Sequence, residues 1–117
     1  MEILKTQPSS EPQRTHVTVN PGVCGFTCVV EAEKQDARTV TLNISGSDCK
    51  HIQRLSELIT VLTLVDIFKP ISKNLVYISA EKAGCHPSCP IPVAVMKAAE
   101  AAMGMALPRD VHITFAS

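Results

Sequence analysis

The sequence has little aromatic surface, no excess of charge and no long apolar run. Its 117 residues include three Phe, one Tyr and no Trp. Lys plus Arg number 11 and Asp plus Glu also number 11, so no basic surface indicates a nucleic acid or an anionic lipid as partner. The longest strongly apolar stretch, residues 58–68, is shorter than the roughly 18 residues that a membrane span needs. We therefore expect a soluble, cytoplasmic protein with no nucleic-acid or membrane partner.

The sequence also lacks the motifs of common enzyme classes. It has no glycine-rich phosphate loop, no serine nucleophile elbow and no paired carboxylates at a recognisable spacing. The sequence therefore gives little support for a hydrolase or a phosphoryl-transfer enzyme. What the chain does have is sulfur, with five Cys residues. An odd number cannot be closed into disulfides within one chain, which disfavours a secreted disulfide framework and favours a reducing compartment.

The length and the apolar share of 45% predict a single domain with one core. Residues 1–15 contain two Pro and several small polar residues and no apolar run of signal-peptide length, so we expect a flexible N-terminal tail. Residues 16–117 then form a single cysteine-rich α+β domain.

The hydrophobic pattern predicts the secondary-structure elements of this domain. A helix begins near Cys49, is expected to stop near Thr60 and restarts near Leu64, and an Ala-rich helix covers residues 93–105. The predicted strands are residues 26–32, 39–44, 75–78 and 111–115. The first two form an antiparallel hairpin. The order β-β-α-β-α-β predicts a two-layer sandwich, with a mixed sheet and the helices on one of its faces.

The five cysteines fall into two pairs of equal spacing and one singleton. Cys24 and Cys28 have three residues between them, Cys85 and Cys89 repeat this spacing, and Cys49 stands alone at the start of a helix. All five are near the ends of predicted elements, where loops can bring several side chains to one point. This placement favours a functional site.

The first hypothesis for this site is a metal centre. Two pairs of thiolates on separate loops can enclose a tetrahedral zinc ion or an iron–sulfur cluster. The preferred ligands are Cys24, Cys28, Cys85 and Cys89, with Cys49 as a replacement or fifth thiol. His51 and His86 could each replace one thiolate. The competing interpretation treats the cysteines as small buried apolar residues, and it fits Cys28 better than Cys85 and Cys89.

The second hypothesis is thiol chemistry at Cys89. Pro90 and Pro92 are compatible with the first turn of the helix that follows, and the positive end of that helix favours a thiolate at Cys89. Cys89 would then be the nucleophile, and Cys85 would resolve a persulfide or a mixed disulfide. Both hypotheses predict a protein partner in electron or sulfur transfer.

Two resemblances bear on these hypotheses. Residues 89–93, Cys-Pro-Ile-Pro-Val, with Lys97 and Gly104, resemble the Cys-Pro-x-Pro helix of the TusA-like sulfur carriers, which implies a persulfide on Cys89. Residues 20–26, 49–52 and 85–90 resemble an uncharacterised group of small cysteine-rich proteins of anaerobic bacteria and archaea. This second resemblance implies a low-oxygen setting and no particular activity.

A third hypothesis makes the protein a binding or subunit-interface domain whose cysteines are incidental. Met96, Met103 and Met105 on the last predicted helix would then form a contact surface. Methionines at this spacing more often fill a core.

Overall fold

The computed structural model describes residues 13–116 and is an α+β domain. Within this range a four-stranded sheet is combined with four α-helices and one 3-10 helix. In chain order the elements are β2 (Arg14–Val19), β3 (Cys28–Asp36), β4 (Thr39–Ser45), α1 (Lys50–Leu58), β5 (Val61–Thr63), α2 (Leu64–Phe68), η2 (Ile71–Lys73), α3 (Leu75–Ala83) and α4 (Ile91–Ala102).

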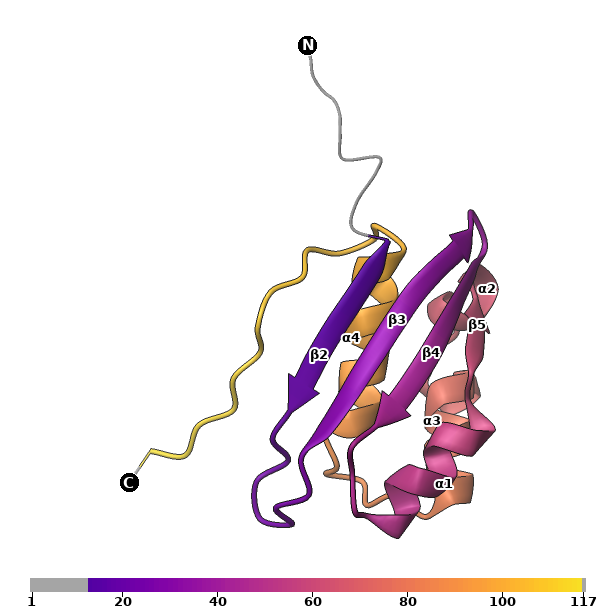
Figure 1. The fold of residues 1–117 in the computed structure, drawn as a ribbon. Helices are drawn as coiled ribbons and strands as arrows, with labels where there is room; N and C mark the ends of the chain where they lie inside the picture. Colours follow the sequence, from indigo (N-terminus) through magenta and orange to yellow (C-terminus); the bar gives the residue numbers. More distant parts are fainter. Residues whose placement is uncertain (1–12, 117) are drawn as a thin grey trace.

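The sheet is antiparallel throughout, with the order β2-β3-β4-β5 (Figure 1). The predicted hairpin is confirmed: β3 and β4 pair along their length and are joined by a two-residue turn at residues 37–38. The prediction of a mixed sheet is wrong. The two late segments expected to be strands, residues 75–78 and 111–115, do not enter the sheet, so no parallel pair of strands forms among the described residues.

One face of the sheet is apolar and the other is polar, because side chains alternate along each strand. Val30 and Ala32 on β3 and Leu42 on β4 are buried, whereas Glu31 and Glu33 lie on the opposite face. The helices lie behind the apolar face in Figure 1, and α4 packs against β2 and β3. Thr15 Oγ1 on β2 donates a hydrogen bond of 2.8 Å to the carbonyl of Ala98, which joins the edge of the sheet to α4.

Residues 75–78 form the start of helix α3 and not the predicted strand. Four apolar residues cannot by themselves distinguish a buried strand from one turn of a helix. The ends of the segment decide: the Asn74 side chain accepts a hydrogen bond from the N–H of Val76, and Gly84 ends the helix with a φ of 84°. This left-handed conformation suits glycine at a helix C-terminus.

The ends of two predicted helical segments can also be compared with the structure. The predicted interruption near Thr60 is confirmed, because α1 ends at Leu58, β5 follows and α2 begins at Leu64. The last helix begins at Ile91 and ends at Ala102, three residues before the predicted end. No helix among residues 13–116 is long and apolar enough to span a membrane.

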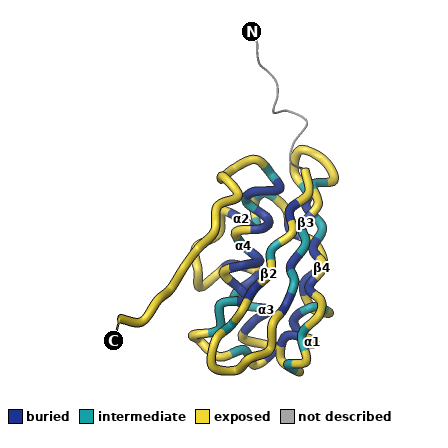
Figure 2. Tube along the Cα trace, turned by 60° about the vertical axis from the view of Figure 1, so that its left-hand side comes forward, coloured by how far each residue is buried: buried dark blue, intermediate teal, exposed yellow. Residues whose placement is uncertain are grey.

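The ends of the chain also differ from the prediction. Residues 111–115 lie in an extended segment that pairs with no strand of the described chain, and Ile113 and Phe115 are 86% and 96% exposed (Figure 2). At the other end, Arg14 and Thr15, which the prediction assigned to the N-terminal tail, are the first residues of β2. Residues 1–12 of that predicted tail lie outside the described residues.

Candidate thiol site

The three connections that carry the five cysteines lie at the same end of the domain, at the bottom of Figure 1. Cys24 lies between β2 and β3, and Cys28 is the first residue of β3. Cys49 is the N-cap residue of α1, directly after β4. Cys85 and Cys89 lie between α3 and α4. All five are free thiols.

The connection between β2 and β3 holds its two cysteines in different environments. Gly22 and Gly25 adopt φ angles of 88° and 71°, and the N–H of Gly25 donates to the carbonyl of Gly22 at 2.9 Å. This turn leaves Cys24 exposed. Cys28 follows three residues after the turn, where β3 passes under the helices, and only 1% of its surface is exposed. The equal spacing of the two cysteine pairs therefore does not give them equal burial.

The connection between α3 and α4 is a tight loop fixed at both ends. The N–H of Cys85 donates to the carbonyl of Ala80 at 3.0 Å, and the N–H of Cys89 donates to the carbonyl of His86 at 3.0 Å. Both cysteine side chains are partly buried against the core. The prediction that Pro92 lies in the first turn of the next helix is confirmed.

His51 joins two of the thiol-bearing connections. Its Nδ1 lies 3.0 Å from the carbonyl oxygen of Ala83. A carbonyl only accepts, so this nitrogen carries the proton and donates. The ring also lies against Gly84, where a Cβ atom would come within 2.9 Å of Nδ1. The start of α1, which bears Cys49, is thereby held beside the loop that bears Cys85.

The sequence contains no signal for this contact. A histidine at the start of a helix is usually solvated, and nothing local links it to a glycine on another helix. The other histidine of the site, His86, is exposed, and its ring centre lies 6.0 Å from that of His51.

Burial and repulsion by neighbouring thiolates raise the pKa values of Cys28 and Cys85. For Cys28, burial first and then the charges of Cys89 and Cys49 together raise the pKa to about 11. For Cys85, the same causes in the same order also raise the pKa to about 11. These electrostatic effects require the thiols to lie near one another.

Opposing effects act on the pKa of Cys89. Burial raises its pKa, the backbone N–H of Ile91 at the start of α4 lowers it, and the charges of Cys24 and Cys49 raise it again. The net shift is upward. We expected the helix N-terminus to lower the pKa of Cys89 overall, and that expectation is wrong because burial outweighs the single N–H donor.

The charge of Cys49 acts on three of the other thiols, namely Cys28, Cys85 and Cys89. Cys49 therefore lies near three of the other thiols and Cys89 lies near all four, although the sequence assigned Cys49 only a reserve role because it has no neighbour at the paired spacing. Across residues 13–116, no three His, Cys, Asp or Glu side chains are oriented so that they could hold a metal ion as they lie. Metal binding at this end would require the side chains to reorient.

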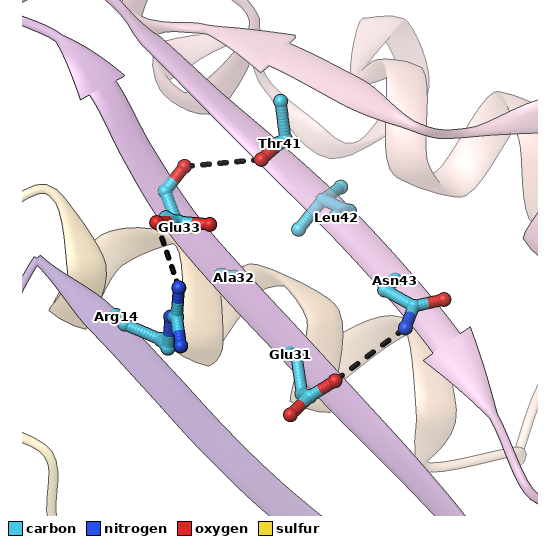
Figure 3. Close-up of a pocket in the computed structure, with 7 residues that line it drawn as sticks. All are labelled: Arg14, Glu31, Ala32, Glu33, Thr41, Leu42 and Asn43. Carbon is cyan, nitrogen blue, oxygen red and sulfur yellow. Dashed lines mark hydrogen bonds and ion pairs between the residues drawn. The ribbon is translucent and has the colours of Figure 1, made fainter.

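Two surface depressions of the described residues lie away from the thiols. One, of about 310 Å³, is on the polar face of the sheet (Figure 3). Its lining residues include Arg14, which forms an ion pair of 2.9 Å with Glu33, and Asn43, whose amide donates to Glu31 at 3.4 Å. Arg14 and Glu33 are exposed and neutralise each other, Asn43 carries no charge, and no thiol lines this depression. This face is an ordinary solvated sheet surface.

Comparison with known proteins assigns the chain to a family. The model of a family of unknown function, DUF6951, matches residues 15–115, so the chain belongs to that family. No curated protein and no solved structure matches the chain significantly.

Proposed function

We propose that the protein binds a metal ion or an iron–sulfur cluster through cysteine thiolates, and that Cys49 is one of the ligands. The observation that carries this proposal is the electrostatic influence of Cys49 on Cys28, Cys85 and Cys89. These four thiols come from three separate connections. Four sulfur ligands are the number that a structural zinc site or a cysteine-bound cluster uses.

Cys24 is the fifth thiol and is proposed as a replacement ligand. It is exposed, and among Cys28, Cys85 and Cys89 its charge acts only on Cys89. This ligand set differs from the one favoured by spacing alone, in which Cys24 preceded Cys49. The glycines on either side of Cys24 leave its turn free to adapt to a bound group.

A bound cation would overcome the raised pKa values of these thiols. Cys28, Cys85 and Cys89 have raised pKa values, and the thiols repel one another when they are ionised. Ionising all of them together is therefore unfavourable in the metal-free protein. A metal ion reverses this balance because it deprotonates the thiols that it binds. The site lies at a loop end of the domain, where a protein partner in electron or sulfur transfer can reach it.

A persulfide carrier with Cys89 as the nucleophile is the second candidate. The N–H of Ile91 favours the Cys89 thiolate, which is the observation in its favour. A persulfide carrier needs a cysteine that is ionised near neutral pH. The pKa of Cys89 is raised above the ordinary value of a thiol, which disfavours the thiolate. It also leaves Cys28 and Cys49 without a role. We therefore place this function second.

Anaerobic purification followed by metal analysis and absorption spectroscopy tests the proposal. An iron–sulfur protein is brown, with iron and sulfide in stoichiometric amounts, and a zinc protein is colourless, with stoichiometric zinc. Cys49→Ser is expected to lose the metal. Cys24→Ser is the matched control, because it also removes one thiol, and it is expected to keep most of the metal. Circular dichroism of both variants verifies that they fold.

Two results would contradict the proposal. One is a protein that stays metal-free after loading with zinc or with iron and sulfide, with all five thiols alkylated at ordinary rates. The other is a metal-free protein in which mass spectrometry finds one added sulfur atom on Cys89 after exposure to a persulfide donor. The second result would establish the carrier function.

A further inference from the structure

The segment that follows α4 has the pattern of a strand without a partner in its own domain. Val111, Ile113 and Phe115 alternate with the polar His112 and Thr114, and their exposed fractions are 56%, 86% and 96%. We call residues 106–116 the C-terminal segment. Three large apolar side chains exposed in a row at alternate positions are unusual on a protein surface and indicate a contact.

The sheet offers an unoccupied edge for such a strand. β2 is the first strand in the order β2-β3-β4-β5 and pairs only with β3 among the described strands. β2 is six residues long, which matches the five alternating residues 111–115, whereas the opposite edge strand β5 has only three residues. An open edge of this length accepts an added strand through its free backbone groups.

The two sides of β2 also match the two sides of the C-terminal segment. Thr15 and Val19 are buried on the side covered by α4, and Arg14 and Thr18 are exposed on the other side. A strand added beside β2 can place Val111, Ile113 and Phe115 on the helix-covered side and the polar residues on the solvated side. α4 packs against β2 and so supplies the layer against which these side chains would pack.

The C-terminal segment stands apart from its own sheet after it leaves α4. Figures 1 and 2 show the segment running on the side of β2 yet separated from it, exposed along its length. The connection contains Gly104, with a φ of 77°, and Pro108, which restricts the backbone four residues later. Within residues 13–116, each copy of the chain therefore presents both a segment without a strand partner and an edge of β2 without one.

We propose that the C-terminal segment pairs with β2 of a second copy of this chain, and that the second copy returns the same contact. A reciprocal exchange closes the assembly as a dimer and leaves no β2 edge open. Short connections that contain proline favour this kind of exchange. The proposal is independent of the thiol site, which lies on the connections between β2 and β3, β4 and α1, and α3 and α4.

Analytical ultracentrifugation of the full chain over a range of concentrations tests this proposal. We expect a dimer. We also expect Ile113→Pro to raise the dissociation constant of the dimer by at least about tenfold, because the substitution removes a backbone donor and an anchoring side chain. Residue 113 lies outside the packed domain, so the variant is expected to fold normally. Phe68→Ser is the matched control: Phe68 is 69% exposed on α2, and its replacement is expected to leave the dimer unchanged.

Hydrogen exchange shows whether the C-terminal segment pairs with the edge of β2 in the dimer. We expect the amides of β2 and of residues 111–115 to be protected in the dimer and to lose protection together on dilution. A chain that stays monomeric at high micromolar concentration would overturn the proposal, even if residues 111–115 were protected, because the segment would then pair within its own chain. A dimer that Ile113→Pro leaves intact would also overturn it.

Discussion

Raising the pH of the metal-free protein is expected to destabilise it, and Cys28→Val is expected to remove a large part of this effect. The pKa of Cys28 is raised from 9.0 to about 11 in the folded protein, chiefly by burial. Between these values the unfolded chain has released the proton while the folded chain still holds it. The free energy of unfolding therefore falls as the pH rises through this window. Below the window, the contribution of the Cys28 proton to stability is fully present.

The magnitude follows from the shift of the pKa. Two pKa units at about 1.4 kcal/mol each give a total loss of about 3 kcal/mol from Cys28 as the pH rises from well below 9 to well above 11. Solvent screens little of it, because only 1% of the Cys28 surface is exposed. Valine has a similar volume and no proton to lose, so the variant is expected to lie within about 1.5 kcal/mol of the wild type near pH 8.

Urea unfolding with a chelator and a reductant, at about pH 8 and about pH 10.5, measures this difference. The wild type is expected to lose about 2 kcal/mol more than Cys28→Val between the two conditions. Cys24→Ser removes an exposed thiol and is expected to behave as the wild type does. An equal loss in the wild type and in Cys28→Val would refute the argument that burial holds the Cys28 proton.

Three further variants test single contacts of the fold by urea unfolding. Thr15→Val removes the hydrogen bond from β2 to α4 and is expected to cost about 1 kcal/mol; no loss would mean that this bond is not formed in solution. Gly84→Ala is expected to cost about 1 to 3 kcal/mol, because φ is 84° and the new Cβ meets His51, and a stable variant would contradict this geometry. Asn74→Ala removes the N-cap of α3 and is expected to cost about 2 kcal/mol, whereas a loss near zero would contradict its role as the cap.

Local patterns in the sequence predicted the parts of the fold that local forces decide. The hairpin of β3 and β4 follows from alternation of apolar residues on both sides of a polar turn, and the break in the helical region follows from β-branched residues near Thr60. The α3 segment was mistaken for a strand because its apolar residues were weighed without the cap at Asn74. Asn74 and Gly84, with nine residues between them, were the available signal for a helix.

Long-range placement could not be predicted in the same way. Residues 111–115 have the alternation of a strand, but whether a strand forms depends on a partner outside the segment. For the thiols, the sequence indicated that they cluster at element ends, and it ranked them by spacing. The position of Cys49 near Cys28, Cys85 and Cys89 depends on where the end of β4 places the start of α1, which no local pattern encodes.

X-ray absorption at the metal edge of anaerobically purified protein tests the central claim most directly. We expect a first shell of sulfur at about 2.3 Å, as thiolate ligands give, with the same shell in Cys24→Ser and no bound metal in Cys49→Ser. A first shell of oxygen and nitrogen, or a protein that takes up no metal, would contradict the account of these five thiols.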